Sequence, residues 1–337
     1  MKRFSLACLR TTALAVFCVA TTAPALAQQE VKIGIGFGVA FLPTYLMDEY
    51  KLVEKHAKAA GLDVKTTYHR FSGSGPMQDA ILSGAVDMGP YGTAALLIAW
   101  EKARNTPQQT FAISGVTTVP MVLLTNKTNV KKLADFTAND RISMPSLVSP
   151  QMFLLQMQSE KEFGAGQHDK LKQQIVSLPH PDSVNQLLSG STEVTGYFAP
   201  PPFIQVALKN QKVSKVMSSA DILGGKASFL IMGATKKWIE TNPKMPDVIV
   251  KAVEEAADFI RSEPRRAAEL YLAREPSRFV DLAAVEEILK EYRDEFGSAV
   301  HGVQVNADFM AKLGQLKSPP KSWKDIVTPS IANTASN

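Results

Sequence analysis

Cysteine is almost missing from this chain of 337 residues, and its two cysteines, Cys8 and Cys18, lie within the first 27 residues. Residues 28–337 therefore cannot form a disulfide, a thiolate metal site or a cysteine nucleophile. They also lack any apolar run that approaches the roughly 20 residues needed to cross a bilayer. A fold built from them must be stabilised by buried apolar surface, which about 310 residues can supply.

A strong charge of one sign is missing as well. The chain has 37 Lys and Arg residues and 32 Asp and Glu residues. Three of the basic residues and none of the acidic ones fall within the first 27, so the remainder carries a net charge of +2. Nucleic-acid-binding proteins usually carry a larger excess of positive charge, so we expect no nucleic-acid partner.

The motifs of common catalytic sites are absent from the sequence. The five histidines lack the HExxH spacing of a metal site, and there is no GxSxG elbow and no P-loop. The glycines at 34, 36 and 38 follow GxGxG rather than GxGxxG, so they predict no nucleotide site. Asp182 near His180 is the one acid–base pair of the predicted cleft, and Asp182 more simply charges the start of its helix. We expect no catalytic residue, no metal and no cofactor.

The first 27 residues are typical of a secretory signal. Lys2, Arg3 and Arg10 form a basic region, residues 14–20 form a short apolar core, and Ala25-Leu26-Ala27 supplies the cleavage pattern. The residue that follows is not the cysteine that lipidation requires. We therefore expect export and cleavage after residue 27.

What the chain does contain is a motif that occurs twice. LSGAVDMG occupies residues 82–89, and LSGSTEVT occupies residues 188–195, 106 positions later. Each copy follows a short predicted helix and precedes an aromatic turn, at Tyr91 in the first half and at Tyr197 in the second. The spacing is too wide for a solenoid repeat. It predicts two similar α/β lobes with a ligand cleft between them.

The order of predicted elements supports two lobes with parallel-rich sheets. We predict strands at 31–36, 63–71, 86–89, 111–114, 120–124, 141–144, 175–178, 194–198 and 228–232, and helices at 43–60, 76–83, 150–163 and 183–189. Residues 119–224 would form lobe II, inserted into a lobe I of residues 28–118 and 225–337. Beyond Pro243 the chain is predicted to be helical, with an apolar stripe at Val248, Val253, Ala256 and Ile260.

Ligands of open α/β sheets bind outside the carboxyl ends of the strands. That rule selects Ser72-Gly73-Ser74-Gly75 before Pro76, where small residues and unpaired helix-start amides would suit an anion. Ser149 before Pro150 repeats this arrangement at what we expect to be the equivalent place in lobe II. Ordinary helix capping is the alternative for both sites.

Aromatic and charged residues follow other strands at the same edge. The aromatic ones either line the cleft or pack in the core, and they are Phe37, Phe41, Tyr91, Tyr197 and Phe198. Arg70 either is a solvated charge at a strand end or pairs with a carboxylate or sulfonate of the ligand.

The signal, the duplication and the motif order together resemble the periplasmic substrate-binding proteins of the nitrate/sulfonate/taurine class of ABC importers. The resemblance covers nearly all of the chain after the signal. The segments that carry it are Ile33–Gly36, Gly61–Val64, Gly73–Pro76, Leu82–Gly89, Leu133–Phe136, Arg141-Ile142, Leu187–Gly190 and Ser322–Asp325.

The resemblance implies a two-lobed type II binding fold with a two-strand hinge. Such a protein closes around one small solute and presents it to an ABC permease in the inner membrane; a periplasmic monomer without enzymatic activity is expected. Enzymatic relatives carry a cysteine-rich segment, which residues 28–337 lack. Carried over by position, the family's pocket corresponds to Phe37, Gly38, Ser72, Gly73, Tyr91, Gly92, Ser146, Ser149, His180 and Tyr197.

The solute and two other roles stay open at this point. A sulfonate, an aromatic carboxylate or a pyrimidine would suit helix starts combined with aromatic side chains. An exported enzyme on the same fold is one alternative to a transport receptor. A ligand-sensing partner of a membrane signalling receptor is the other.

Overall fold

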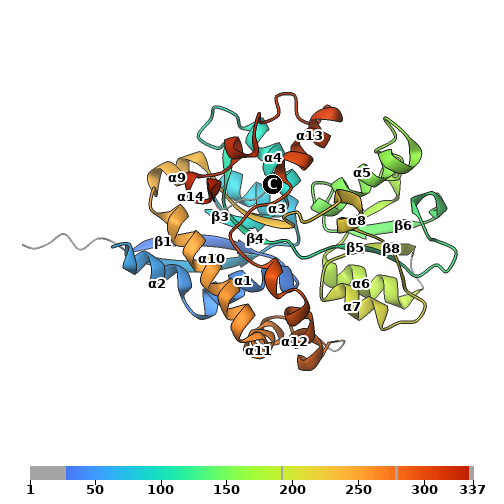
Figure 1. Ribbon diagram of the computed structural model, residues 1–337, viewed down its shortest axis with the longest axis horizontal. Helices are drawn as coiled ribbons and strands as arrows, with labels where there is room; N and C mark the ends of the chain where they lie inside the picture. Colours follow the sequence, from blue (N-terminus) through green and yellow to red (C-terminus); the bar gives the residue numbers. More distant parts are fainter. Residues whose placement is uncertain (1–27, 191–192, 278–279, 334–337) are drawn as a thin grey trace, which may run out of the picture.

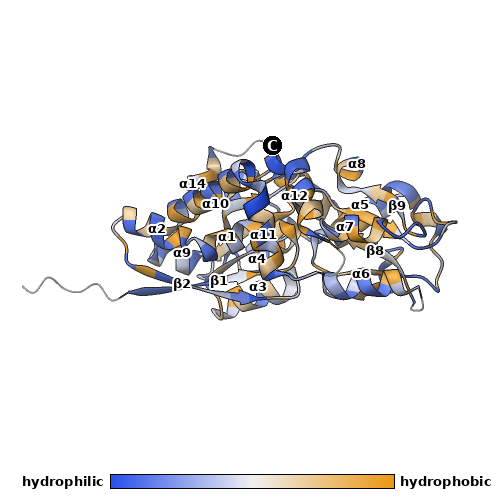
Figure 2. Ribbon diagram, turned by 90° about the horizontal axis from the view of Figure 1, so that it is seen from below, coloured by the Kyte–Doolittle hydropathy of each residue, from blue (hydrophilic) through white to orange (hydrophobic). Residues whose placement is uncertain are grey.

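The structure is a computed structural model that describes residues 28–190, 193–277 and 280–333. The predicted signal, residues 1–27, lies outside the described residues. Two five-stranded sheets form the centres of two lobes, which lie side by side along the long axis of the molecule (Figures 1 and 2). The fold is therefore the two-lobed α/β arrangement that the sequence predicts.

The sheet of the first lobe has the strand order β2-β1-β3-β10-β4. Strand β1 pairs in parallel with β2 and β3, whereas β10 runs antiparallel to both β3 and β4. The bounds of these strands are β1 Gln29–Ile35, β2 Val64–Arg70, β3 Met88–Tyr91, β4 Thr110–Thr117 and β10 Leu230–Thr235.

The second sheet repeats this arrangement in the order β7-β6-β8-β5-β9. Here β6 pairs in parallel with β7 and β8, and β5 runs antiparallel to β8 and β9. The strands are β5 Val122–Thr125, β6 Arg141–Met144, β7 Ile175–Ser177, β8 Val194–Ala199 and β9 Ser214–Ser218. All of them lie between β4 and β10 in the sequence, so the chain crosses between the lobes twice. The lobe limits at residues 119 and 224 stay a prediction.

Helices cover both sheets (Figure 1). In the first lobe they are α1 Leu42–Glu49, α2 Leu52–Ala59, α3 Ser74–Ser83, α4 Thr93–Lys102 and α9 Lys236–Thr241; in the second, α5 Pro150–Phe163, α6 His180–Ser189, α7 Phe203–Leu208 and α8 Ser219–Leu223. The last part of the chain adds α10 Met245–Ser262, α11 Pro264–Arg274, α12 Leu282–Glu291, α13 Val303–Lys312 and α14 Pro329–Ala332. The apolar stripe predicted for α10 is confirmed, because all four of its residues are buried.

The duplicated motif marks the same step in both lobes. In each copy the helix ends at a glycine in the left-handed conformation, Gly84 after α3 and Gly190 after α6. A residue with a Cβ would be strained there. The chain then enters β3 or β8, the middle strand of its sheet, which pairs in parallel with β1 or β6. The repeat therefore encodes a helix-to-strand connection that each lobe uses once.

Several predicted elements differ from the observed ones. The single helix predicted at 43–60 is two helices, because Lys51 adopts a left-handed conformation between α1 and α2. The aromatic turn predicted around Tyr91 is the end of strand β3, whereas Tyr197 lies within β8, as the strand predicted at 194–198 implies. The prediction that Ser149 occupies the place equivalent to residues 72–75 is wrong in topology. Helix α5 follows β6, which holds the position of β1 in the order of its sheet, whereas α3 follows β2, whose counterpart is β7.

Candidate functional site

A small chamber lies between the lobes where the starts of α3 and α5 meet. It has about 20 Å³ of room, which suits one water molecule. Six of the residues predicted for the site line it: Phe37, Phe41, Ser72, Gly73, Ser149 and His180. Gln151, Phe71, Phe229 and Leu230 also line it and were not predicted.

The start of α5 brings polar atoms without protein partners into this chamber. Ser149 has the extended N-cap conformation and Pro150 follows at the first helical position, as predicted, but the Ser149 hydroxyl makes no capping bond. Its Oγ and both amide atoms of Gln151 are buried without a hydrogen-bond partner among the described residues. Leaving such a group unpaired costs about 1–3 kcal/mol. These atoms are therefore the most poorly satisfied polar groups of the chamber.

Gln151 was not predicted as a site residue, although its position in the sequence is unusual. It stands directly before the apolar run from Met152 to Leu155, at the first turn of a helix that was correctly predicted. A polar residue beside such a run is usually placed at the surface. Its burial follows from the docking of the α5 start against the first lobe, which the sequence does not reveal.

The start of α3 differs, because its buried hydroxyl already has a partner. The amide of Gly92 donates to Oγ of Ser74 at 3.1 Å. Ser72 is exposed, and Gly73 presents backbone alone to the chamber. The first lobe therefore forms part of the chamber wall here but offers few free hydrogen-bonding groups.

Glycines of the first lobe lie directly against residues of the second. A Cβ atom added to Gly73 would be 2.7 Å from Cβ of Pro145, and one added to Gly92 would be 2.3 Å from Cγ of Pro150. Ser146 lies nearby, 3.6 Å from the Cβ position of Gly75, and its hydroxyl is buried without a partner among the described residues. Such close approach needs residues without side chains, so the lobes are in tight contact around the chamber.

His180, at the first turn of α6, forms one side of the chamber. A hydrogen bond of 2.7 Å joins its Nδ1 to the hydroxyl of Tyr197, and its ring stacks on Phe203 with centroids 5.5 Å apart. Burial lowers the pKa of His180 to about 3, so the ring is neutral at pH 7. Tyr197 itself is fully buried, and it fixes the orientation of His180 without lining the chamber.

The predicted aromatic residues divide between cavity and core. Phe41 lines the chamber and packs its ring over Gly36. Tyr91 does not line it; its ring lies over Gly233 inside the first lobe. Burial raises the pKa of the Tyr91 hydroxyl. Phe198 is likewise fully buried in the core.

The amide of Gly38, predicted to bind the ligand, has a partner within the protein. It donates to both carboxylate oxygens of Glu275 at 2.8 and 3.1 Å. Tyr271 donates to the same carboxylate at 3.1 Å, and Tyr45 donates to it as well. Burial raises the pKa of Glu275, although the hydrogen bonds and nearby Arg70 lower it in part. Glu275 therefore holds the loop that places Phe37 at the edge of the chamber.

A much larger groove of about 720 Å³ lies on the other side of Phe37. Arg70, the predicted anion partner, opens onto this groove and not onto the chamber. Its guanidinium lies 4.8 Å from the centre of the Phe37 ring. The groove spans both lobes, from α11 on one side to α6 and α7 on the other.

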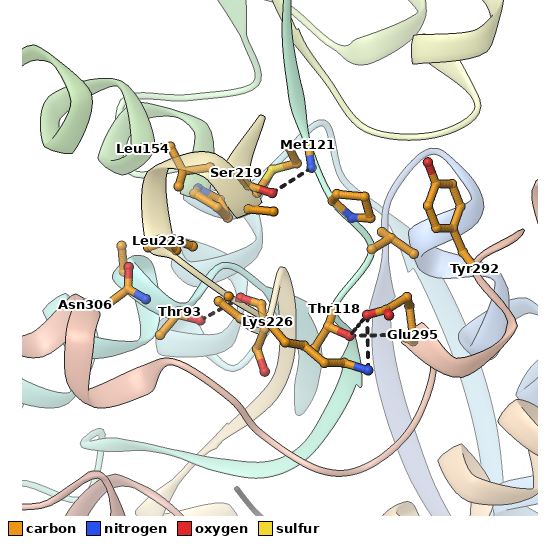
Figure 3. A pocket seen from close by; sticks show the side chains of 18 of the residues that line it. Thr93, Thr118, Met121, Leu154, Ser219, Leu223, Lys226, Tyr292, Glu295 and Asn306 are labelled. Atoms are coloured by element: carbon orange, nitrogen blue, oxygen red, sulfur yellow. Dashed lines mark hydrogen bonds and ion pairs between the residues drawn. The ribbon is translucent and has the colours of Figure 1, made fainter. Parts of the chain in front are cut away.

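A third cavity of about 560 Å³ lies beside the two connections between the lobes, residues 118–121 and 219–228 (Figure 3). Figure 3 shows Thr118 and Lys226, one from each connection, meeting at Glu295. The amide of Met121 donates to Oγ of Ser219 at 3.0 Å. Because these polar groups bind one another, the cavity is best explained as part of the hinge.

Two further properties concern the described residues as a whole. They contain no group of three or more His, Asp and Glu side chains that could hold a metal ion. None of their helices is both long enough and apolar enough to span a bilayer.

Comparison with known proteins agrees with this architecture. Residues 25–273 match the NMT1-like family, whereas a search of curated proteins gives no match. Many solved structures are similar, and they include three binding proteins. The periplasmic aliphatic sulphonate binding protein SsuA from Escherichia coli has a TM-score of 0.66 and 14% identity, covering 91% of this chain and 100% of its own. The alkanesulfonate-binding protein SsuA from Xanthomonas axonopodis pv. citri, bound to MOPS, has a TM-score of 0.67 and 14% identity. The match covers 90% of this chain and 97% of that protein.

The third is the periplasmic nitrate-binding protein NrtA from Synechocystis PCC 6803, with a TM-score of 0.59 and 12% identity, covering 78% of this chain and 70% of its own. At these identities the structures establish the fold, and the family match covers well over half of the sequence. The chain therefore belongs to the NMT1-like family and has the periplasmic binding protein fold.

Proposed function

We propose that this protein is a solute receptor of an ABC importer that binds a small organic solute between its lobes. The observation that carries the proposal is the start of α5, where Oγ of Ser149 and the amide of Gln151 are buried at the interface of the lobes with no partner among the described residues. A solute that hydrogen-bonds to them would satisfy groups that are costly to leave unpaired.

Binding would work by a shift between open and closed arrangements. The chamber is too small for an organic solute while the lobes are in contact, so the lobes must separate to admit one. Residues 115–119 and 224–228 would supply the hinge between a lobe II of residues 119–224 and the rest of the chain. A solute that touches both lobes stabilises the closed arrangement over the open one.

We favour a receptor over an exported enzyme because the suggested acid–base pair is not organised for proton transfer. His180 is neutral and bonded to Tyr197, and Asp182 is exposed two residues later in the same turn of α6. The solved relatives are also named as binding proteins. Recovery of a bound compound unchanged after long incubation would support the receptor; its conversion would support an enzyme.

The proposed setting is the periplasm, with an inner-membrane permease as partner and the receptor as a monomer. It rests on the predicted signal and on solved relatives that are named as periplasmic binding proteins. No observation favours the signalling alternative over this one.

The test is a thermal-shift screen of purified protein with MOPS, methanesulfonate, aromatic acids and pyrimidines. A tight solute at 100 times its Kd stabilises the fold by about 2.7 kcal/mol, which raises the melting temperature by several degrees. Small-angle X-ray scattering should then show that the same solute reduces the radius of gyration. The proposal is wrong if no compound of these classes stabilises the protein and no solute changes its shape.

A further inference from the structure

The groove beside the chamber has the size of a binding site for an organic molecule. Its volume of about 720 Å³ lies within the range of roughly 300–1,000 Å³ that is usual for small-molecule sites. Phe37 separates it from the chamber and contributes to both. An organic solute that is too large for the chamber therefore has room directly next to it.

The wall contributed by the second lobe is apolar except for Asn185. Val184 comes from α6, and Phe203 and Val206 come from α7. Pro181 and Pro202 extend the same surface. An aliphatic or aromatic body placed against this wall would be removed from water, which stabilises binding by about 25 cal/mol for each Å² of apolar surface covered.

The opposite wall carries a guanidinium that no carboxylate neutralises directly. Arg70 has no Asp or Glu oxygen within 4.0 Å among the described residues. Arg274 in the same groove differs, because it pairs with Asp48 at 2.8 Å and with Glu49 at 3.0 Å. The carboxylate of Glu275 is bonded to the Gly38 amide and two tyrosine hydroxyls. Arg70 is thus the cation of this groove that can receive an anionic group.

We propose that this groove is a binding site for an organic acid with an apolar body, whose carboxylate or sulfonate pairs with Arg70 while the body packs on Val184, Phe203 and Val206. The inference deepens the proposed function, on which it rests, by naming the class of solute and a second set of contacts outside the chamber. It selects aromatic or branched organic acids over pyrimidines and over very small anions.

The test is calorimetric titration of the full chain with phenylacetate, 4-phenylbutyrate and 2-naphthoate, with phenylacetamide as the uncharged control. Arg70→Gln should weaken acid binding at least tenfold and leave phenylacetamide unaffected. Lys65→Gln removes an exposed positive charge elsewhere on the same strand, and it should change acid affinity less than twofold.

Asn185 offers a second test that does not risk the fold, because it is exposed on α6 and lines the groove. Asn185→Glu should weaken acid binding three- to tenfold, and Asn185→Lys should strengthen it by a similar factor at low salt. The inference is overturned if none of the three acids binds the wild-type protein, or if they bind equally well to the Arg70 and Asn185 variants. Binding of methanesulfonate or a pyrimidine in those cases would leave the proposed function standing.

Discussion

The starts of α3 and α5 look alike in sequence, yet they bring different chemistry to the same chamber. Each has small residues and a serine shortly before a proline. At α3 the buried hydroxyl of Ser74 accepts from Gly92, so its hydrogen-bonding capacity serves the fold. At α5 the hydroxyl of Ser149 and the amide of Gln151 serve no internal bond among the described residues. The first lobe thus supplies shape, and the second supplies groups that can bind a solute.

This division suits a receptor that works by closure. Glycines on the first lobe let the prolines of the second approach closely, which brings the α5 start under cover. Contacts that exist in the closed arrangement alone add to its stability and not to that of the open one. We therefore expect substitutions near the start of α3 to shift the equilibrium between the open and closed arrangements. Substitutions near the start of α5 should change the hydrogen bonds to the solute.

The largest effect is expected from Gly92→Ala. Its new methyl group would lie 2.3 Å from Cγ of Pro150, and relieving such an overlap costs about 3 kcal/mol. Under the proposed closure the clash would exist in the closed form alone, so solute affinity should fall about 100-fold. Titration calorimetry gives the affinity, and scattering should show a more open protein.

Gly75→Ala is the matched control for that substitution. It adds the same methyl group on the same face, where the nearest atoms of Ser146 and Val148 lie at an ordinary 3.6 Å. Affinity should change less than threefold. Equal affinities of the two variants would show that close approach at Gly92 is not needed for binding.

Next in size is Gln151→Leu, which should act in opposite directions on binding and stability. Loss of the amide should weaken solute binding by about 2 kcal/mol, about 30-fold. The free protein should become more stable by about 1 kcal/mol, because a buried polar group without a partner is replaced by an apolar one. Calorimetry and urea unfolding measure the two quantities.

Gln156→Leu on the same helix provides the contrast. Its amide donates to Asp169 at 2.7 Å, so this variant should lose stability and keep most of its affinity. If Gln151→Leu also lost stability, Gln151 would have a structural role, and the asymmetry between the two helix starts would be refuted.

The pH dependence of His180 should give an effect of similar size. Between pH 6.5 and 3 the unfolded chain binds a proton that the folded chain does not, because burial lowers the pKa of this residue to about 3. Stability is therefore present above pH 6.5 and lost as the pH falls. From pH 7 to pH 5 the loss amounts to about 2 kcal/mol.

Urea unfolding at both pH values should show that His180→Gln removes this part of the decrease. The same substitution at exposed His69 should leave the wild-type dependence in place. An unchanged pH dependence in the His180 variant would contradict burial of the neutral ring.

The smallest effects, about 1 kcal/mol, are expected for Ser74→Ala and Ser149→Ala, and they should differ in kind. Ser74→Ala removes the acceptor of the Gly92 amide and should lower the free energy of unfolding by that amount. Ser149→Ala removes a buried hydroxyl that makes no capping bond, so stability should not fall while affinity falls about fivefold. Loss of stability in Ser149→Ala would instead favour ordinary capping.

Much of the fold follows from local sequence pattern. The strands near β1, β6 and β8, the stripe of α10 and the repeat that ends at Gly84 and Gly190 depend on residues close together in the chain. Six predicted residues also line the chamber, because strand ends and helix starts of an α/β sheet gather at one edge. The break at Lys51 and the strand position of Tyr91 were missed, because packing overrides the local signal there.

The sequence by itself determined the number of lobes, the class of fold and the family, since hydrophobic periodicity and the order of motifs are written along the chain. The tertiary structure alone decided which polar groups are left for a solute. Gly38 is bonded to Glu275, 237 residues away in the sequence, within the first lobe. Gln151 is buried without a partner among the described residues where the start of α5 meets the first lobe. Whether a polar atom has a partner depends on which residues meet in space, and neighbours in sequence do not fix that.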